Sequence, residues 1–193
     1  MEERKLNEKE SLELISQMIL NAKQKLEDET SMPFIIFGYA TFVVSLIVYF
    51  LITKTGNYQF HWLWFLIPMI GYFGMFIYSK KTQKHSRNQM DRIIINVWMV
   101  IGIASLLIAF AAFFVRIPIL SVMILLMGIG TAITGLIVKS KLVAISGFVG
   151  MASSAIIYMV KGDEQILVFG LIFLITMIIP GHLLNFQYRK RHV

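Results

Sequence analysis

The chain has 193 residues, the length of one ordinary domain, but 57% of them are hydrophobic and only 15% are charged. Its mean hydropathy of +0.72 is too high for a water-soluble domain, whose exterior must be polar. It contains no cysteine, which excludes disulfides, thiolate zinc sites, iron–sulfur clusters and cysteine nucleophiles. The composition therefore predicts a membrane protein.

The first segment, 1–32, is predicted to form an amphipathic helix that precedes the membrane spans. Asn7 followed by Glu10 has the spacing of a capped helix start, and the run Thr30-Ser31-Met32-Pro33 is expected to end the helix. Between them, apolar residues recur every three or four positions. They form one stripe on the helix: Leu12, Ile15, Ile19, Ala22 and Leu26.

The stripe has three candidate docking surfaces: the lipid headgroups, the end of its own bundle, and a protein partner. Residues 1–30 contain eight acids and five bases, so anionic lipid is expected to repel the segment. Three short heptads also make an isolated coiled coil marginal. Docking on the bundle is therefore the simplest structural expectation. Self-association or a cytoplasmic protein partner is the functional alternative.

Six apolar runs, each long enough to cross a bilayer, fill residues 33–185. At about 1.5 Å per residue they give helices of roughly 29–35 Å, which matches the hydrocarbon core of a bilayer. Because the runs are continuous, without the alternation of barrel strands, they indicate helices. The sequence thus predicts an all-α membrane protein with a basic tail at 186–193 and six spans: 34–52, 60–78, 93–115, 119–138, 142–160 and 166–184.

The basic residues lie almost wholly on one side of these spans. Fifteen of the 18 Lys and Arg residues fall in the N-terminal segment, the second and fourth loops and the tail. The other side holds only Lys54, Arg116 and Lys161. The positive-inside rule then places both ends in the cytoplasm. Orientation and contact with membrane lipids account for the net charge of +7, so no nucleic-acid partner is expected.

Small residues predict where the spans pack together. In lipid, association depends on close backbone approach, which small faces allow. We expect the fourth and fifth spans to pack as a hairpin, joined by the short turn Lys139-Ser140-Lys141; a homodimer seam is the alternative reading. The helix-packing positions are Gly128, Ala132 and Gly135 in the fourth span and Ser146, Gly150 and Ser154 in the fifth.

Two prolines, Pro68 and Pro180, interrupt the second and sixth spans and predict kinks there. Kinked helices in matching positions are a feature of some transporters, although single kinks are common in membrane helices.

Polar groups within the spans are few. Asn96 is predicted to make an interhelical hydrogen bond. Four hydroxyl residues are expected to hydrogen-bond to nearby backbone: Ser105, Thr131, Thr134 and Thr176. No acidic or basic residue lies near the middle of a span, which argues against ion pumps and proton-coupled carriers.

No arrangement of residues indicates catalysis or a metal site. The four histidines lack metal-ligand spacing, and neither a serine hydrolase elbow nor a phosphate-binding glycine loop is present. The outward end of the second span carries an aromatic group, including Tyr58, Trp62 and Trp64, which is expected to lie at headgroup level. We therefore predict a protein that is not an enzyme and that has no cofactor, no catalytic residue and no metal ligand.

Three stretches, Leu6–Ile19, Lys54–Tyr58 and Trp62–Pro68, carry a family resemblance. With them the first eighty residues resemble small polytopic inner-membrane proteins of Bacteroidota. The resemblance implies a bacterial inner-membrane location with the outer loops in the periplasm. It implies no activity and no functional residue.

Two functional hypotheses follow from the sequence. The first is a non-enzymatic sensor, regulatory or scaffolding component, in which the N-terminal helix couples the bundle to a cytoplasmic partner. The second is a small-solute or lipid transporter or channel that lacks an intramembrane ionisable residue. A cavity beside Pro68, Asn96 and Pro180 would favour the second hypothesis.

Overall fold

The computed structural model describes residues 7–81, 89–112 and 114–190, which are helical apart from short connections and contain no β-strand. Within these residues six helical segments are long and apolar enough to cross a membrane, which confirms the predicted helical class and number of spans. The segments are Ser31–Thr55, Tyr58–Lys80, Met90–Ala111, Ile119–Ile137, Lys141–Met159 and Glu164–Phe186.

Two of these segments combine different helix types. The second begins as a 3₁₀ helix and the sixth contains a π-helical turn. In chain order the elements are α1 (Glu8–Thr55), the 3₁₀ helix η1 (Tyr58–Phe65), α2 (Leu66–Lys81), α3 (Gln89–Ala111), α4 (Ile119–Ile137), α5 (Lys141–Met159), α6 (Glu164–Phe173), the π-helical turn η2 (Leu174–Ile178) and α7 (Ile179–Lys190).

The helix α1 is uninterrupted over 48 residues, about 72 Å at ~1.5 Å per residue. The predicted end at Thr30-Ser31-Met32-Pro33 is wrong, because Pro33 lies inside the helix. Ser31 and Phe34, on either side of the proline, are 0% and 1% exposed. Packing of these neighbours keeps the turn helical despite the hydrogen bond that a proline removes.

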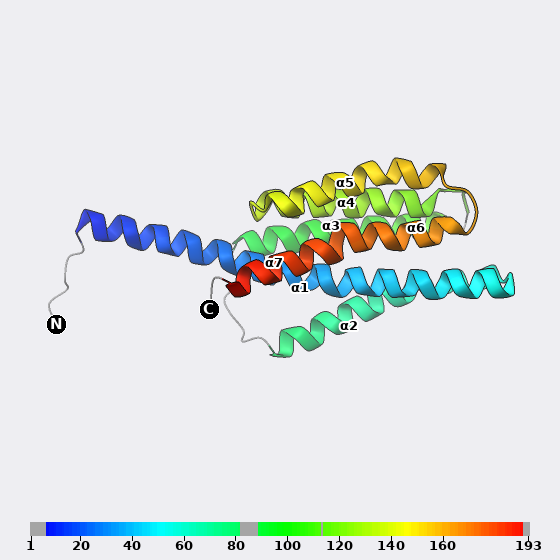
Figure 1. The fold of residues 1–193 in the computed structure, drawn as a ribbon, viewed down its shortest axis with the longest axis horizontal. Coiled ribbons are helices and arrows are strands. Elements are labelled where there is room, and N and C mark those ends of the chain that lie inside the picture. Colours follow the sequence, from blue (N-terminus) through cyan, green and yellow to red (C-terminus); the bar gives the residue numbers. More distant parts are fainter. Residues whose placement is uncertain (1–6, 82–88, 113, 191–193) are drawn as a thin grey trace.

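Figure 1 shows α1 running the length of the molecule, with its first part extending beyond the bundle. α1 contacts α2 on one side and the α6–η2–α7 run on the other. That run lies between α1 and the antiparallel hairpin of α4 and α5, and α3 packs mainly against α4. The largest buried cluster joins these layers through aromatic and aliphatic side chains: Phe34, Ile124, Val143, Ile157, Phe169, Ile172, Phe173, Met177 and Leu184.

The two ends of the bundle differ in what they hold. The terminal end, at which α1 enters and α7 ends, also carries the α4–α5 turn, and the distal end carries the α1–η1 and α5–α6 connections. α1 ends at Thr55, and the next residue, Gly56, has a φ of +66°. Lys139 in the α4–α5 turn has a φ of +56°, a conformation that usually selects glycine. α3 ends at Ala111 rather than at the predicted Val115, and α4 begins directly after Pro118, which disfavours helix at Ile117.

Candidate functional site

The N-terminal segment starts as the sequence predicts. The backbone N–H of Asn7 donates to Oε2 of Glu10 at 3.1 Å, and the helix begins at Glu8. This bond satisfies one of the amide groups that a helix start leaves without an intrahelical partner. The cap stabilises the start of a helix that lies outside the bundle, where packing against other helices does not stabilise it.

The part of the apolar stripe that is described faces solvent. Leu12 is 66% exposed and Ile15 is 51% exposed, and their neighbours Leu14 and Met18 are exposed as well. Docking of these side chains on the bundle is therefore a wrong expectation, because α1 continues through Pro33 and carries them away from it. The side chains of the remaining stripe positions lie outside the described residues: Ile19, Ala22 and Leu26.

The small residues of α4 and α5 meet in one seam. A Cβ on Gly128 would lie 2.7 Å from the backbone nitrogen of Met151, and a Cβ on Gly135 would overlap the backbone of Ala144. A Cβ on Gly150 would lie 3.3 Å from the Cα of Gly128. All six predicted packing positions are buried: Gly128, Ala132, Gly135, Ser146, Gly150 and Ser154. The contacts lie within one chain, so the hairpin already occupies this surface.

Two further residues of this seam are absent from the predicted set. A Cβ on Gly147 would overlap the backbone of Ala132, and the hydroxyl of Ser121 donates to the Ser154 carbonyl. Gly147 precedes Gly150 by three positions, so a search at both three- and four-residue spacing would have found it.

A second close seam joins α1 to the last span. A Cβ on Gly38 would lie 2.7 Å from Cγ1 of Ile178, and one on Gly181 would lie 2.8 Å from Cγ1 of Ile35. The two glycines are far apart in the chain, so no spacing rule relates them. Their pairing follows only from the packing of α1 against η2 and α7.

The two prolines lie where the helix type changes. Pro68 is the third residue of α2, a helix that directly follows the 3₁₀ helix η1. Pro180 is the second residue of α7, which directly follows the π-helical turn η2. The hydroxyl of Thr176, within η2, donates to the Ile172 carbonyl at 2.8 Å. The backbone is therefore irregular close to both positions at which the sequence predicts a kink. The kinks themselves stay a prediction.

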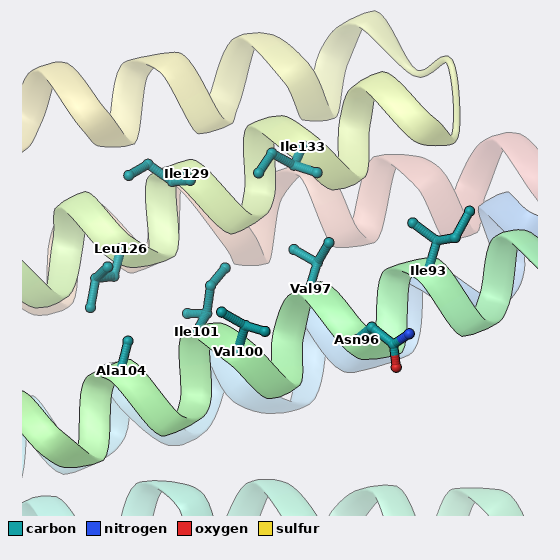
Figure 2. A pocket seen from close by; sticks show the side chains of 9 residues that line it. All are labelled: Ile93, Asn96, Val97, Val100, Ile101, Ala104, Leu126, Ile129 and Ile133. Carbon is teal, nitrogen blue, oxygen red and sulfur yellow. The ribbon is translucent and has the colours of Figure 1, made fainter.

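Asn96 lies on α3 with its side chain exposed. It borders a groove of about 500 Å³ between α3 and α4, whose other lining residues are all apolar. Figure 2 shows Val97 and Ile101 pointing toward α4, whereas the amide of Asn96 turns away from it. Neither Pro68 nor Pro180 lines the groove, so the three residues do not form one cavity.

The polar and aromatic side chains are engaged locally. His61 accepts from Nε1 of Trp64 at 3.1 Å, and His182 lies 3.1 Å from the hydroxyl of Tyr39. Trp64 packs edge-on against Phe169 with 5.2 Å between ring centroids, so its ring contacts the buried cluster. The headgroup-level location of this aromatic group stays a prediction. His85 and His192 lie outside the described residues, and the described ones contain no cluster of metal-ligating side chains.

Comparisons with known proteins give this arrangement no precedent. No protein-family model, no curated protein and no solved structure matches the chain. Three features of the molecule itself bear on its function: the exposed start of α1, the continuity of α1 into the bundle, and the exposed face of α3.

Proposed function

We propose that the chain is a non-enzymatic regulatory or scaffolding protein of the bacterial inner membrane, in which α1 couples the bundle to a cytoplasmic partner. The observation that carries this proposal is the continuity of α1 from its exposed start into the core. A partner that moves or rotates the outer part of such a helix also acts on the part within the bundle.

The orientation follows from the charges. The terminal end of the bundle carries the outer part of α1, the α4–α5 turn and the end of α7. By the sequence, these segments belong to the side that holds fifteen of the 18 basic residues. The positive-inside rule supports a cytoplasmic location for this end. The resemblance to inner-membrane proteins of Bacteroidota agrees with this orientation.

A protein partner suits the exposed stripe better than lipid does. From Glu8 to Thr30 the helix extends about 35 Å at ~1.5 Å per residue, along an axis that leads away from the bundle. Its net negative charge also opposes anionic headgroups. Apolar side chains held exposed in water, such as Leu12 and Ile15, are typical of a protein interface.

Inside the bundle, α1 is placed to transmit a displacement. It contacts η2 through Gly38 and Ile178, and π-helical turns are frequent at functional sites because their backbone is irregular. A small rotation of α1 would change the packing at this turn directly.

The test compares the apolar and polar faces of the outer helix. The double variant Leu12→Lys, Ile15→Lys is expected to lose the proteins that co-purify with the chain from native membranes. The matched control Gln17→Lys lies on the polar face and should retain them. Neither change touches the bundle, so thermal stability should stay the same. Identical co-purifying proteins for both variants, and for a deletion of residues 1–30, would remove the proposal's support.

The transporter hypothesis has one feature in its favour, the groove beside Asn96. This groove is shallow and open to the side, and it lies between α3 and α4 rather than between the proline-containing helices. An apolar surface of this kind suits contact with a lipid chain or another helix better than passage of a solute.

A further inference from the structure

The helix α3 is poorly covered by the rest of the chain. Only 6% of the most apolar 18-residue stretch of this span is buried. In the span that contains α6 and α7, 56% of the corresponding stretch is buried. Its attachment to α4 includes a hydrogen bond from Nε1 of Trp98 to Oγ1 of Thr134, at 3.1 Å, and the buried side chain of Ile101. The opposite face is open over its whole length.

From Asn96 onward this open face is apolar except at Asn96 itself, and the exposed Arg92 lies on the same face one turn earlier. Val100 is 64% exposed, Ile103 54% and Leu107 66%. Asn96 lies four residues before Val100 and seven before Ile103, so it lies on the same face. It lies four residues after the charged Arg92, about 6 Å along the helix at ~1.5 Å per residue.

The Asn96 amide has no hydrogen-bond partner in the part of the chain that the structure describes, and it turns away from α4 (Figure 2). A carboxamide that faces hydrocarbon without a partner is unfavourable, because the hydrogen bonds it makes with water are lost. Within membranes, asparagine side chains commonly bond across to another helix. The position therefore calls for a polar group from outside this chain.

The spacing of the exposed residues fits a helix pair. They alternate at intervals of three and four positions, which keeps one seam facing a partner along a left-handed crossing. The seam residues are Asn96, Val100, Ile103, Leu107 and Phe110.

We propose that this face of α3 binds the same face of a second copy of the chain, with the two Asn96 amides hydrogen-bonded to each other. An amide offers both donors and an acceptor, so two identical amides at the same depth satisfy one another across a two-fold axis. From Asn96 onward the seam holds no charged side chain, and Arg92, one turn earlier on the same face, is at the end of the span, where its long side chain can reach the membrane surface. The adjacent groove gives the second copy's apolar side chains a surface to enter. The proposal rests on the membrane insertion proposed above, but not on the coupling role of α1.

The test uses the absence of cysteine from the sequence. Single cysteines replace Val100, Ile103 or Leu107, and oxidation in native membranes is expected to give covalent dimers at all three positions. The matched control is Ile156→Cys on α5, which is 60% exposed at a similar depth but lies outside the seam. It should give few dimers.

The role of Asn96 is tested in the Ile103→Cys chain. Asn96→Leu should lower the yield of dimers about three- to tenfold, whereas Asn96→Gln should largely retain it. Because the side chain is exposed, neither change should alter the thermal stability of the monomer in detergent. Equal cross-linking at Ile156, or no effect of Asn96→Leu, would overturn the proposal and leave lipid or another protein on this face. Release of the chain from membranes at alkaline pH would instead overturn membrane insertion itself.

Discussion

At the scale of single residues, several polar side chains hydrogen-bond within their own helix. The hydroxyls of Thr134 and Thr176 donate to the carbonyls four residues earlier, as expected for such residues in membrane helices. Ser105 departs from this expectation, since its buried Oγ has no partner among the described residues.

Two glycines differ strongly in how much space surrounds them. A Cβ on Gly147 would overlap the backbone of Ala132, whereas a Cβ on Gly102 would have no atom within 4 Å. Backbone cannot move aside as the end of a flexible side chain can. Replacement of glycine by alanine should thus change the free energy of unfolding in opposite directions at the two positions.

We expect Gly147→Ala to lower the free energy of unfolding by about 1–3 kcal/mol, through steric overlap in the α4–α5 seam. Gly102→Ala should raise it by about 0.5–1 kcal/mol, because alanine favours the helix and meets nothing. Unfolding of both variants in the same detergent measures the difference. A shift of the same sign for both would contradict the close approach of α4 and α5.

At the scale of elements, prolines have different consequences according to their place. Pro33 lies inside α1 and removes a hydrogen bond from a continuous helix, but Pro118 lies just before α4, where no helical bond is lost. The changes of helix type at η1 and η2 show a third case, in which the proline follows an irregular turn.

Replacing Pro33 by alanine should therefore stabilise α1, by about 1–3 kcal/mol, because the missing amide hydrogen is restored. Amide hydrogen exchange over the turn before residue 34 should slow accordingly. Pro118→Ala serves as the control and should instead destabilise by about 0.4–1 kcal/mol, since the unfolded chain gains freedom. Faster exchange near residue 33 in the alanine variant would show that the helix breaks there.

At the scale of the whole molecule, the bundle is unevenly packed. In the most apolar 18-residue stretch of each span, 39% is buried in the first span and 56% in the span of α6 and α7. In the second and third spans only 6% is buried. The well-packed layers are α1, α4, α5 and the α6–η2–α7 run. The second and third spans lie at the edge, where their surfaces are open to lipid or to another chain.

The orientation of the molecule gives a direct prediction. Single cysteines at Asn57 and Lys161, on the side that holds few basic residues, should react in intact cells with a thiol reagent that does not cross membranes. Cysteines at Ser86 and Arg191 should react only after the membrane is opened. The chain has no cysteine of its own, so each signal reports one position. Labelling of position 86 in intact cells would reverse or break the proposed topology.

The sequence alone determined the features that depend on local composition. The six spans could be predicted because a helix that crosses a hydrocarbon core requires about 20 consecutive apolar residues. The Asn7–Glu10 start was readable because a cap involves neighbours in the chain. The small residues of α4 and α5 were likewise predictable, since a short turn makes these spans neighbours.

The tertiary structure decided the features that depend on distant residues. Local rules end the first helix before Pro33, but burial of Ser31 and Phe34 against the bundle carries it through. The close approach of Gly38 to Ile178 joins residues that no sequence spacing relates. Only packing could show that the Asn96 side chain faces outward from α3. Composition specifies which segments suit a membrane, whereas long-range packing decides which faces of those segments remain uncovered.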